Sequence, residues 1–233
     1  MANEADTAER FVREVVERCR KYPFRAIHFV AVLDRASTDG TLDLLRKQVA
    51  SLAELRVVYA PENRGVVDAY MRGYREALAL GADWVLEMDA GYSHQPADIP
   101  KFLDGLAPHE DAVFATRFAR GSHYAGGIGR RFLVSWLGSW VARVLLGVRL
   151  SDATSGFQLF SAAALERVVD RGLQSRGPFF QTEIKYRLRD CRVREVPIHY
   201  IPTAQAVRPA ALGDALRVVL RLLRERLASP LTP

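Results

Sequence analysis

Asp89 offers the clearest chance of chemistry in this 233-residue chain, because its carboxylate follows an apolar run. Residues 83–88 are predicted to form a buried strand, and the chain then turns at Gly91. α/β enzymes commonly place a metal ligand or catalytic group at the carboxyl end of such a strand. Carboxylate oxygen is the ligand that Mg²⁺ and Mn²⁺ prefer. The sequence therefore predicts a divalent-cation ligand at Asp89.

A second carboxylate is missing where it would complete such a site, because Gly91 stands two residues after Asp89. Two neighbours could compensate. Glu87 lies on the same strand face as Asp89, although one pleat back. His94 follows the turn and is better placed to hydrogen-bond it. We therefore expect weakened or altered metal binding rather than its certain absence.

Polar residues also follow the other predicted strands. Asp34 follows residues 26–33, Asn63 comes shortly after residues 55–59, and Arg117 follows residues 111–116. In open α/β sheets, ligands bind beyond the carboxyl ends of the strands. We expect these side chains and Asp89 to line one ligand site.

The elements that position these residues alternate in type. The predicted strands cover residues 26–33, 55–59, 83–88 and 111–116, and the predicted helices cover residues 7–22, 41–53, 66–80 and 97–106. The connections are too long for hairpins. This pattern predicts an α/β fold with a largely parallel sheet flanked by helices.

Two helices of the second half carry apolar faces with more than one interpretation. In residues 130–148, Trp136 and Trp140 cluster with leucine and valine, which indicates core packing or an interfacial helix. Arg143 interrupts this segment, so no membrane span is expected. Residues 212–227 predict a basic amphipathic helix that either caps the domain or lies on an anionic membrane. We expect one α/β domain at 1–203 and a C-terminal amphipathic helix and tail at 204–233.

Composition limits the partners and the compartment. The net charge of +6 suits an anionic partner, although solubility alone would explain it. No nucleic-acid-binding motif is present, so nucleic acid is not expected as a partner.

Cys19 and Cys191 lie far apart and predict neither a disulfide framework nor a zinc site. The charged opening of the chain is unlike a secretory signal. We expect a cytoplasmic protein, with contact at the cytoplasmic face of a membrane as an option.

Five segments in order carry a resemblance to a known family. They are LDRASTDGT (33–41), the stretch 63–91 ending in LEMDAG, the TRF, GG and RRFLVS elements (116–135), DATSGFQLF (152–160) and EVPIHY (195–200). They resemble the family-2 glycosyltransferases, specifically the type that includes dolichol-phosphate and polyprenol-phosphate mannosyltransferases. The resemblance covers nearly the whole chain.

The resemblance implies a single nucleotide-diphospho-sugar-binding domain of the GT-A type. The implied reaction moves a sugar from a GDP- or UDP-sugar to a lipid phosphate with inversion. Asp34, Asp39 and Asn63 would hold the nucleotide, and Asp89 would bind Mg²⁺ or Mn²⁺. A plain helix cap is the alternative for Asp39.

The implied acceptor site contains Arg117 and Arg131, which resemble residues that grip the acceptor phosphate. Arginine suits this role because its planar fork meets phosphate oxygens bidentately. The alternative for Arg131 is a solvated charge.

The acceptor remains open between two chemistries. A phosphate is already ionised and needs no general base, whereas a hydroxyl of a surface glycan or glycolipid needs a carboxylate to take its proton. Asp152 is the candidate base, unless it only caps the turn at residues 154–156. A non-catalytic nucleotide-sugar-binding module is the alternative of another class.

Three departures from the family pattern bear on activity. Gly91 replaces the second Asp of the D-x-D motif. The family's opening strand is matched only at its end, by residues 1–4, so the first strand is apparently missing. Arg35 and Ala36 replace the Asp-Gly of the first motif, which reverses a charge beside the expected base pocket.

Overall fold

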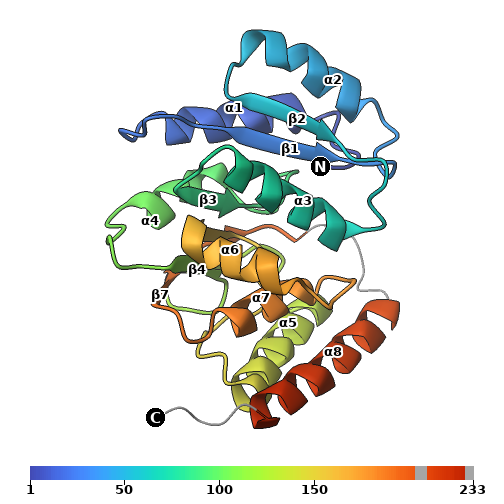
Figure 1. Cartoon of the computed structure of the whole chain (residues 1–233), viewed down its shortest axis with the longest axis vertical. Helices are drawn as coiled ribbons and strands as arrows, with labels where there is room; N and C mark the ends of the chain where they lie inside the picture. Colours follow the sequence, from blue (N-terminus) through green and yellow to red (C-terminus); the bar gives the residue numbers. More distant parts are fainter. Residues whose placement is uncertain (203–208, 229–233) are drawn as a thin grey trace.

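A computed structural model describes residues 1–202 and 209–228, in which helices cover both faces of a β-layer (Figure 1). The strands are β1 (Phe29–Leu33), β2 (Leu55–Tyr59), β3 (Trp84–Glu87), β4 (Ala112–Thr116), β5 (His123–Tyr124), β6 (Gln158–Ser161), β7 (Val193–Pro197) and β8 (His199–Tyr200). The α-helices are α1 (Ala8–Cys19), α2 (Thr41–Gln48), α3 (Val66–Ala79), α4 (Ile99–Leu103), α5 (Arg130–Val141), α6 (Ala162–Arg171), α7 (Phe180–Arg187) and α8 (Pro209–Ala228). The expected domain boundary at 203/204 lies outside the described residues.

The β-layer consists of separate sheets. β1 pairs with β2 in parallel, and a second sheet has the order β3-β6-β4-β7. β4 and β7 are parallel, whereas β6 runs antiparallel to both β3 and β4. The α/β class with parallel strand pairs is confirmed, and β6 makes the larger sheet mixed. The strand predicted at residues 55–59 begins and ends where β2 does.

Two helices join the β1-β2 sheet to the larger one. On α1, Phe11 packs into the core beneath β4, while Val12 packs against β1. On α3, Gly73 lies so close to β1 that a β-carbon there would sit 3.4 Å from Val32 Cγ2. Tyr74 of the same helix packs against Phe160 of β6. The carboxyl ends of β1 and β3 are therefore held beside each other by packing.

The C-terminal helix α8 caps the domain. Its Val218, Val219 and Leu222 are buried in the main hydrophobic core. Tyr186 of α7 donates its hydroxyl hydrogen to Leu222 O, and Arg226 Nη1 donates to Leu145 O of the π-helical segment η3 (Ala142–Leu146). The capping alternative for this helix is confirmed. No helix among the described residues combines the length and hydropathy needed to cross a membrane.

Candidate active site

Asp89 lies in the turn after β3, and one oxygen of its carboxylate accepts a hydrogen bond from another side chain. Tyr70 of α3 donates its hydroxyl hydrogen to Asp89 Oδ1 at 2.5 Å. The side chain of Asp89 remains 45% exposed. Tyr70 therefore fixes one oxygen of the carboxylate and leaves the group open to a ligand.

His94 fixes the backbone of the same turn. Its Nδ1 accepts the backbone N–H of Asp89 at 3.0 Å, and its ring stacks on Phe157. A nitrogen that accepts a hydrogen bond carries no proton, so the ring is neutral with its hydrogen on Nε2. Burial lowers the pKa of His94 and favours the same state. The expectation that His94 hydrogen-bonds the turn is confirmed.

Glu87 is directed into the core rather than toward a surface cation. It is 5% exposed and accepts hydrogen bonds from Gln158 Nε2 at 2.7 Å, from Gln181 Nε2 at 2.5 Å and from the Tyr74 hydroxyl. Burial raises the pKa of Glu87 to about 7. Lys185 belongs to the same network through Gln158 Oε1. Glu87 is thus a structural carboxylate in this conformation.

Asp152 and Arg117 form a buried bidentate ion pair. Arg117 Nε lies 2.7 Å from Asp152 Oδ2, and Nη2 lies 2.9 Å from Oδ1. Asp152 also accepts the backbone N–H groups of Arg117, Thr154 and Ser155. Burial raises the pKa of Asp152, but the charge and hydrogen bonds of Arg117 outweigh it, and the pKa is lowered. Such a carboxylate is a weak base, and it caps the turn at residues 154–156.

Tyr200 of β8 contacts both arginines that are expected to bind the acceptor. The guanidinium of Arg117 lies 5.0 Å from its ring centroid, and that of Arg131 lies 5.9 Å away. Arg131 Nη2 also donates to the Tyr200 hydroxyl at 2.9 Å. The ring of His94 lies 5.6 Å from the same tyrosine. Arg117, Arg131 and Asp152 therefore share one corner with the Asp89 turn.

On the nucleotide side, Asp39 ties the start of α2 to the beginning of the chain. It accepts the N–H and hydroxyl of Thr41 and the N–H of Ala5. The Thr41 hydrogen bond is the main reason that the pKa of Asp39 falls to about 2. The local capping role of Asp39 is thus present.

The other two residues expected to hold the nucleotide occupy neighbouring loops. Asp34 Oδ1 accepts the N–H of Ala36 at 2.9 Å. Asn63 follows β2, and its side-chain nitrogen is buried without a hydrogen-bond partner within the described residues. That donor is unsatisfied in this conformation. In the described part of the chain it makes no hydrogen bond to the carboxylates of Asp34 or Asp89.

Asp89 has the donor chemistry for Mg²⁺ or Mn²⁺. Among the described residues, no three His, Cys, Asp or Glu side chains converge on one metal position. Mg²⁺ commonly uses one or two protein carboxylates, substrate phosphates and water. Asp89, as an open carboxylate, fits that pattern and would supply one such ligand.

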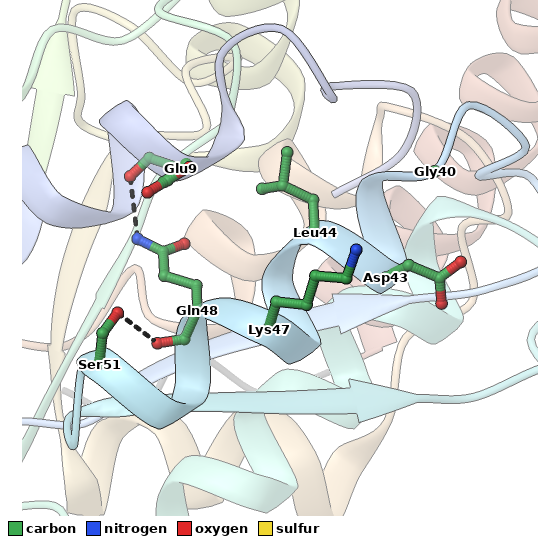
Figure 2. Close-up of a pocket in the computed structure, with 7 residues that line it drawn as sticks. All are labelled: Glu9, Gly40, Asp43, Leu44, Lys47, Gln48 and Ser51. Carbon is green, nitrogen blue, oxygen red and sulfur yellow. Dashed lines mark hydrogen bonds between the residues drawn. The ribbon is translucent and has the colours of Figure 1, made fainter.

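A surface hollow lies between α1 and α2 and reaches Gly40, the residue after Asp39 (Figure 2). Its wall includes Glu9, Lys47 and Gln48, and Gln48 Nε2 donates to Glu9 O at 3.1 Å. None of the expected site residues lines it. We assign the active site to the strand ends and not to this hollow.

Sequence reasoning missed Tyr70 and Tyr200. Tyr70 lies within the segment 63–91 that was compared with the family, and Tyr200 ends the EVPIHY motif. Tyr200 reaches the Asp89 turn through a bridge to His94. The available signal was an aromatic residue with a hydroxyl inside each motif, but only the fold reveals which carboxylate or arginine it meets.

Comparison with known proteins defines the family. Residues 1–169 match the model of glycosyl transferase family 2, and the chain belongs to this family. It is therefore a glycosyltransferase, which disfavours the non-catalytic module. Undecaprenyl-phosphate mannosyltransferase of Micrococcus luteus is 33% identical over 202 residues, covering 86% of this chain and 83% of that protein. Polyprenol monophosphomannose synthase of Mycolicibacterium smegmatis is 29% identical over 174 residues, covering 73% of this chain and 66% of that protein.

Solved structures agree with the fold. Glucosyl-3-phosphoglycerate synthase of Mycobacterium tuberculosis, crystallised with Mn²⁺, UDP and phosphoglyceric acid, aligns with a TM-score of 0.65 at 18% identity. The alignment covers 100% of this chain and 78% of that one. At this identity the likeness establishes the nucleotide-sugar transferase fold alone.

Proposed function

We propose that the protein transfers a sugar from a GDP- or UDP-sugar to a polyprenyl phosphate, with inversion at the anomeric carbon. The observation that carries the proposal is the state of Asp152. Because this carboxylate is buried and held by Arg117, it is poorly suited to take a proton from a hydroxyl acceptor. A phosphate acceptor needs no such base. The names of the two mannosyl-transferring relatives support the same acceptor.

The residues have separate roles in this reaction. Asp34, Asp39 and Asn63 hold the nucleotide, and Asp89 holds a divalent cation. That cation, when bound, neutralises charge on the departing diphosphate. Arg131, on the ring of Tyr200, attracts the acceptor phosphate. Arg117 adds positive charge beside it while remaining paired with Asp152.

Helix α5 supports a lipid acceptor because its exposed side is apolar. On the side that packs on the protein, Phe132 contacts Tyr124, and Ser139 is buried with its Oγ accepting the N–H of Ala153. The side that faces solvent is apolar, and Trp136 and Trp140 are each 51% exposed. The alternative of core packing for these tryptophans was therefore wrong. Apolar stripes with tryptophan suit the headgroup zone of a bilayer.

Helix α8 extends this apolar surface. Beside the stripe that caps the core, Leu212, Leu216 and Leu220 form a second stripe with i, i+4 spacing that is exposed. Arg217, Arg221 and Arg224 lie on an adjoining exposed face. α8 packs against η3, which continues α5, so the two apolar stripes belong to one end of the molecule (Figure 1). We propose that this end lies on an anionic membrane.

The position of Arg131 joins the two parts of the proposal. Arg131 lies in the first turn of α5, at the end of the helix nearest Tyr200, and the stripe of Leu133, Trp136 and Leu137 leads away from it. A lipid phosphate held by Arg131 would have its hydrocarbon chain beside that stripe. The phosphate and chain of one acceptor would thus meet matching surfaces.

A transfer assay tests the proposed reaction. Vesicles containing undecaprenyl phosphate are incubated with protein, Mn²⁺ and radiolabelled GDP-mannose, UDP-glucose or other donors. We expect label in the lipid fraction with one donor, and the Asp89→Asn variant provides the blank. Release of nucleotide diphosphate with label found only on hydroxyl acceptors, such as glycolipids lacking phosphate, would contradict the proposal.

Vesicle sedimentation tests the membrane surface separately. Replacing Trp136 and Trp140 by alanine should reduce binding to phosphatidylglycerol vesicles. The matched control replaces Phe24 and Tyr59, which are similarly exposed elsewhere. Equal binding of both double variants would show that α5 is not the docking surface.

A further inference from the structure

Gly91 is positioned so that another residue fills the place of its missing side chain. Its φ is +74°, in the left-handed region that favours glycine. A β-carbon at this position would lie 2.6 Å and 2.7 Å from the two carboxylate oxygens of Glu4. The Glu4 carboxylate thus occupies the space that a side chain at residue 91, two residues after Asp89, would enter.

Glu4 is held in this position from both sides of its backbone. Its N–H donates to Thr41 Oγ1 at 2.9 Å, and the following N–H, of Ala5, donates to Asp39 Oδ2 at 2.8 Å. The Thr7 hydroxyl donates to Glu4 Oε2 at 3.1 Å. The carboxylate is therefore anchored to the start of α2 and directed at the Asp89 turn.

Three carboxylates lie near the amino group of Met1. Burial lowers the pKa of the Met1 amino group, and the charges of Asp34, Glu4 and Asp89 oppose that effect. All three are therefore close enough to act on one point. Glu4 enters this region from a different part of the chain than the family's second acidic residue.

We propose that Glu4 supplies the second carboxylate of the divalent-cation site, replacing the side chain that Gly91 lacks. This inference rests on the proposed function, because the cation is needed there to bind a nucleotide diphosphate. Asp89 and Glu4 would each contribute carboxylate oxygen, and diphosphate and water would complete the ligands, as Mg²⁺ and Mn²⁺ allow. Nothing in the D-x-D pattern predicts a ligand 85 residues before Asp89.

The proposal also accounts for the glycine. With this backbone, a β-carbon at 91 would overlap the Glu4 carboxylate where it now lies, so a side chain at 91 would displace that carboxylate. Glycine at 91 therefore leaves room for the Glu4 carboxylate. The proposed site has two carboxylates, Asp89 and Glu4, although the D-x-D segment contains only Asp89.

Mn²⁺ binding tests the proposal without relying on turnover. Free Mn²⁺ is measured by electron paramagnetic resonance in mixtures of protein with GDP or UDP, against nucleotide alone. Glu4→Gln should weaken Mn²⁺ binding in the ternary complex by about 10-fold or more. The matched control Glu17→Gln, an exposed glutamate on α1, should leave it unchanged. Equal Mn²⁺ affinity of Glu4→Gln and the unaltered protein would overturn the proposal.

Moving the carboxylate back gives a second, gain-of-binding test. Glu4→Ala should lose Mn²⁺ affinity, and Glu4→Ala combined with Gly91→Asp should regain part of it. Aspartate tolerates left-handed backbone better than most residues. A double variant that has a normal thermal transition but no regained affinity would count against the proposal.

The outcomes separate this proposal from the proposed function. If the unaltered protein binds no Mn²⁺ with either nucleotide, the Glu4 inference fails, and the lipid-transfer assay still decides the reaction. If lipid transfer fails while Glu4→Gln weakens Mn²⁺ binding, the metal site stands and the acceptor must be sought elsewhere.

Discussion

Two carboxylates of the candidate active site, Asp152 and Asp89, lie in opposite environments. Asp152 is fully buried, and both of its oxygens receive hydrogen bonds from Arg117 and from backbone N–H groups. Asp89 is 45% exposed, and Tyr70 holds one of its oxygens. The hydrogen-bonding capacity of Asp152 is thus used by the protein itself. Asp89 is oriented by Tyr70, and its second oxygen can still bind a ligand.

The same contrast recurs along β3 and the turn after it. Glu87 and Asp89 are two residues apart, and each receives a hydroxyl hydrogen from α3. The donors, Tyr74 and Tyr70, are four residues apart and so lie on one face of that helix. Glu87 receives two further side-chain donors, from Gln158 and Gln181. The number of protein donors thus distinguishes the fully hydrogen-bonded carboxylate of Glu87 from the open carboxylate of Asp89.

The largest expected effect is the loss of stability in Asp152→Ala. This substitution leaves the guanidinium of Arg117 buried without its counter-charge. Breaking a buried pair from one side costs about 3–5 kcal/mol. The free energy of unfolding, measured by urea titration, should fall by that amount. A loss below about 0.5 kcal/mol, typical of a surface site, would contradict the contrast with Asp89.

Asp89→Asn should reduce activity and leave stability nearly unchanged, the opposite of Asp152→Ala. The carboxylate is half exposed, so the thermal transition should change little. Sugar transfer should fall by about 10²–10³-fold, the usual loss when a group that stabilises developing charge is removed. The check is the lipid-transfer assay beside a calorimetric scan of the same sample. Near-normal turnover in a folded variant would overturn the assignment of Asp89 as the metal ligand.

Sequence patterns were sufficient for the first half of the fold. Alternating apolar runs and helical stripes located β1 to β4 and α1 to α4, with ends that differ by a few residues. They did not locate β6, α6 or α7. β6 is short, and its Gln158 is buried between β3 and β4 as part of the Glu87 network, so it shows no alternation of apolar and polar residues.

The site was predicted in its parts but not in its pairings. Asp34, Asp89 and Arg117 follow their strands as expected. The Arg117–Asp152 pair joins residues 35 apart, and Glu4 meets Gly91 across most of the first half of the chain. Such contacts depend on how loops converge at a sheet edge. The outward stripe of α5 was equally hidden, because periodicity shows that a helix has an apolar face but not which side the protein covers.

The acidity of Glu87 offers a finer test of the contrast with Asp89. Burial raises its pKa from 4.5 to about 7, so the folded state holds the proton more tightly than the unfolded state. The stability that this contributes is fully present below pH 4.5 and is lost as the pH rises through about 7. Glu87→Gln removes this dependence. The melting temperature of the unaltered protein minus that of Glu87→Gln should therefore be larger at pH 5 than at pH 7.

Lys185, the buried cation of the same network, does not cancel in that comparison, because burial lowers its pKa to about 8 and the charge of Glu87 opposes this effect. The comparison therefore stops at pH 7, below the range in which Lys185 loses its proton. A gap in melting temperature that is constant from pH 5 to 7 would mean that Glu87 is ionised throughout that range. The donors around it would then outweigh its burial.

The smallest expected effect separates the two tyrosines of α3. Tyr70→Phe removes the donor that orients Asp89, and loss of one hydrogen bond to a charged group corresponds to about 1.5–3 kcal/mol at most. Because Asp89 is open to water, solvent replaces part of this, and we expect about a 5-fold rise in the Mn²⁺ dissociation constant of the nucleotide complex. Tyr74→Phe should leave that constant unchanged and lower the melting temperature instead, since water cannot reach Glu87. If both variants changed Mn²⁺ affinity equally, the two carboxylates would be one coupled unit, and the distinction between a satisfied and an open carboxylate would not hold along β3.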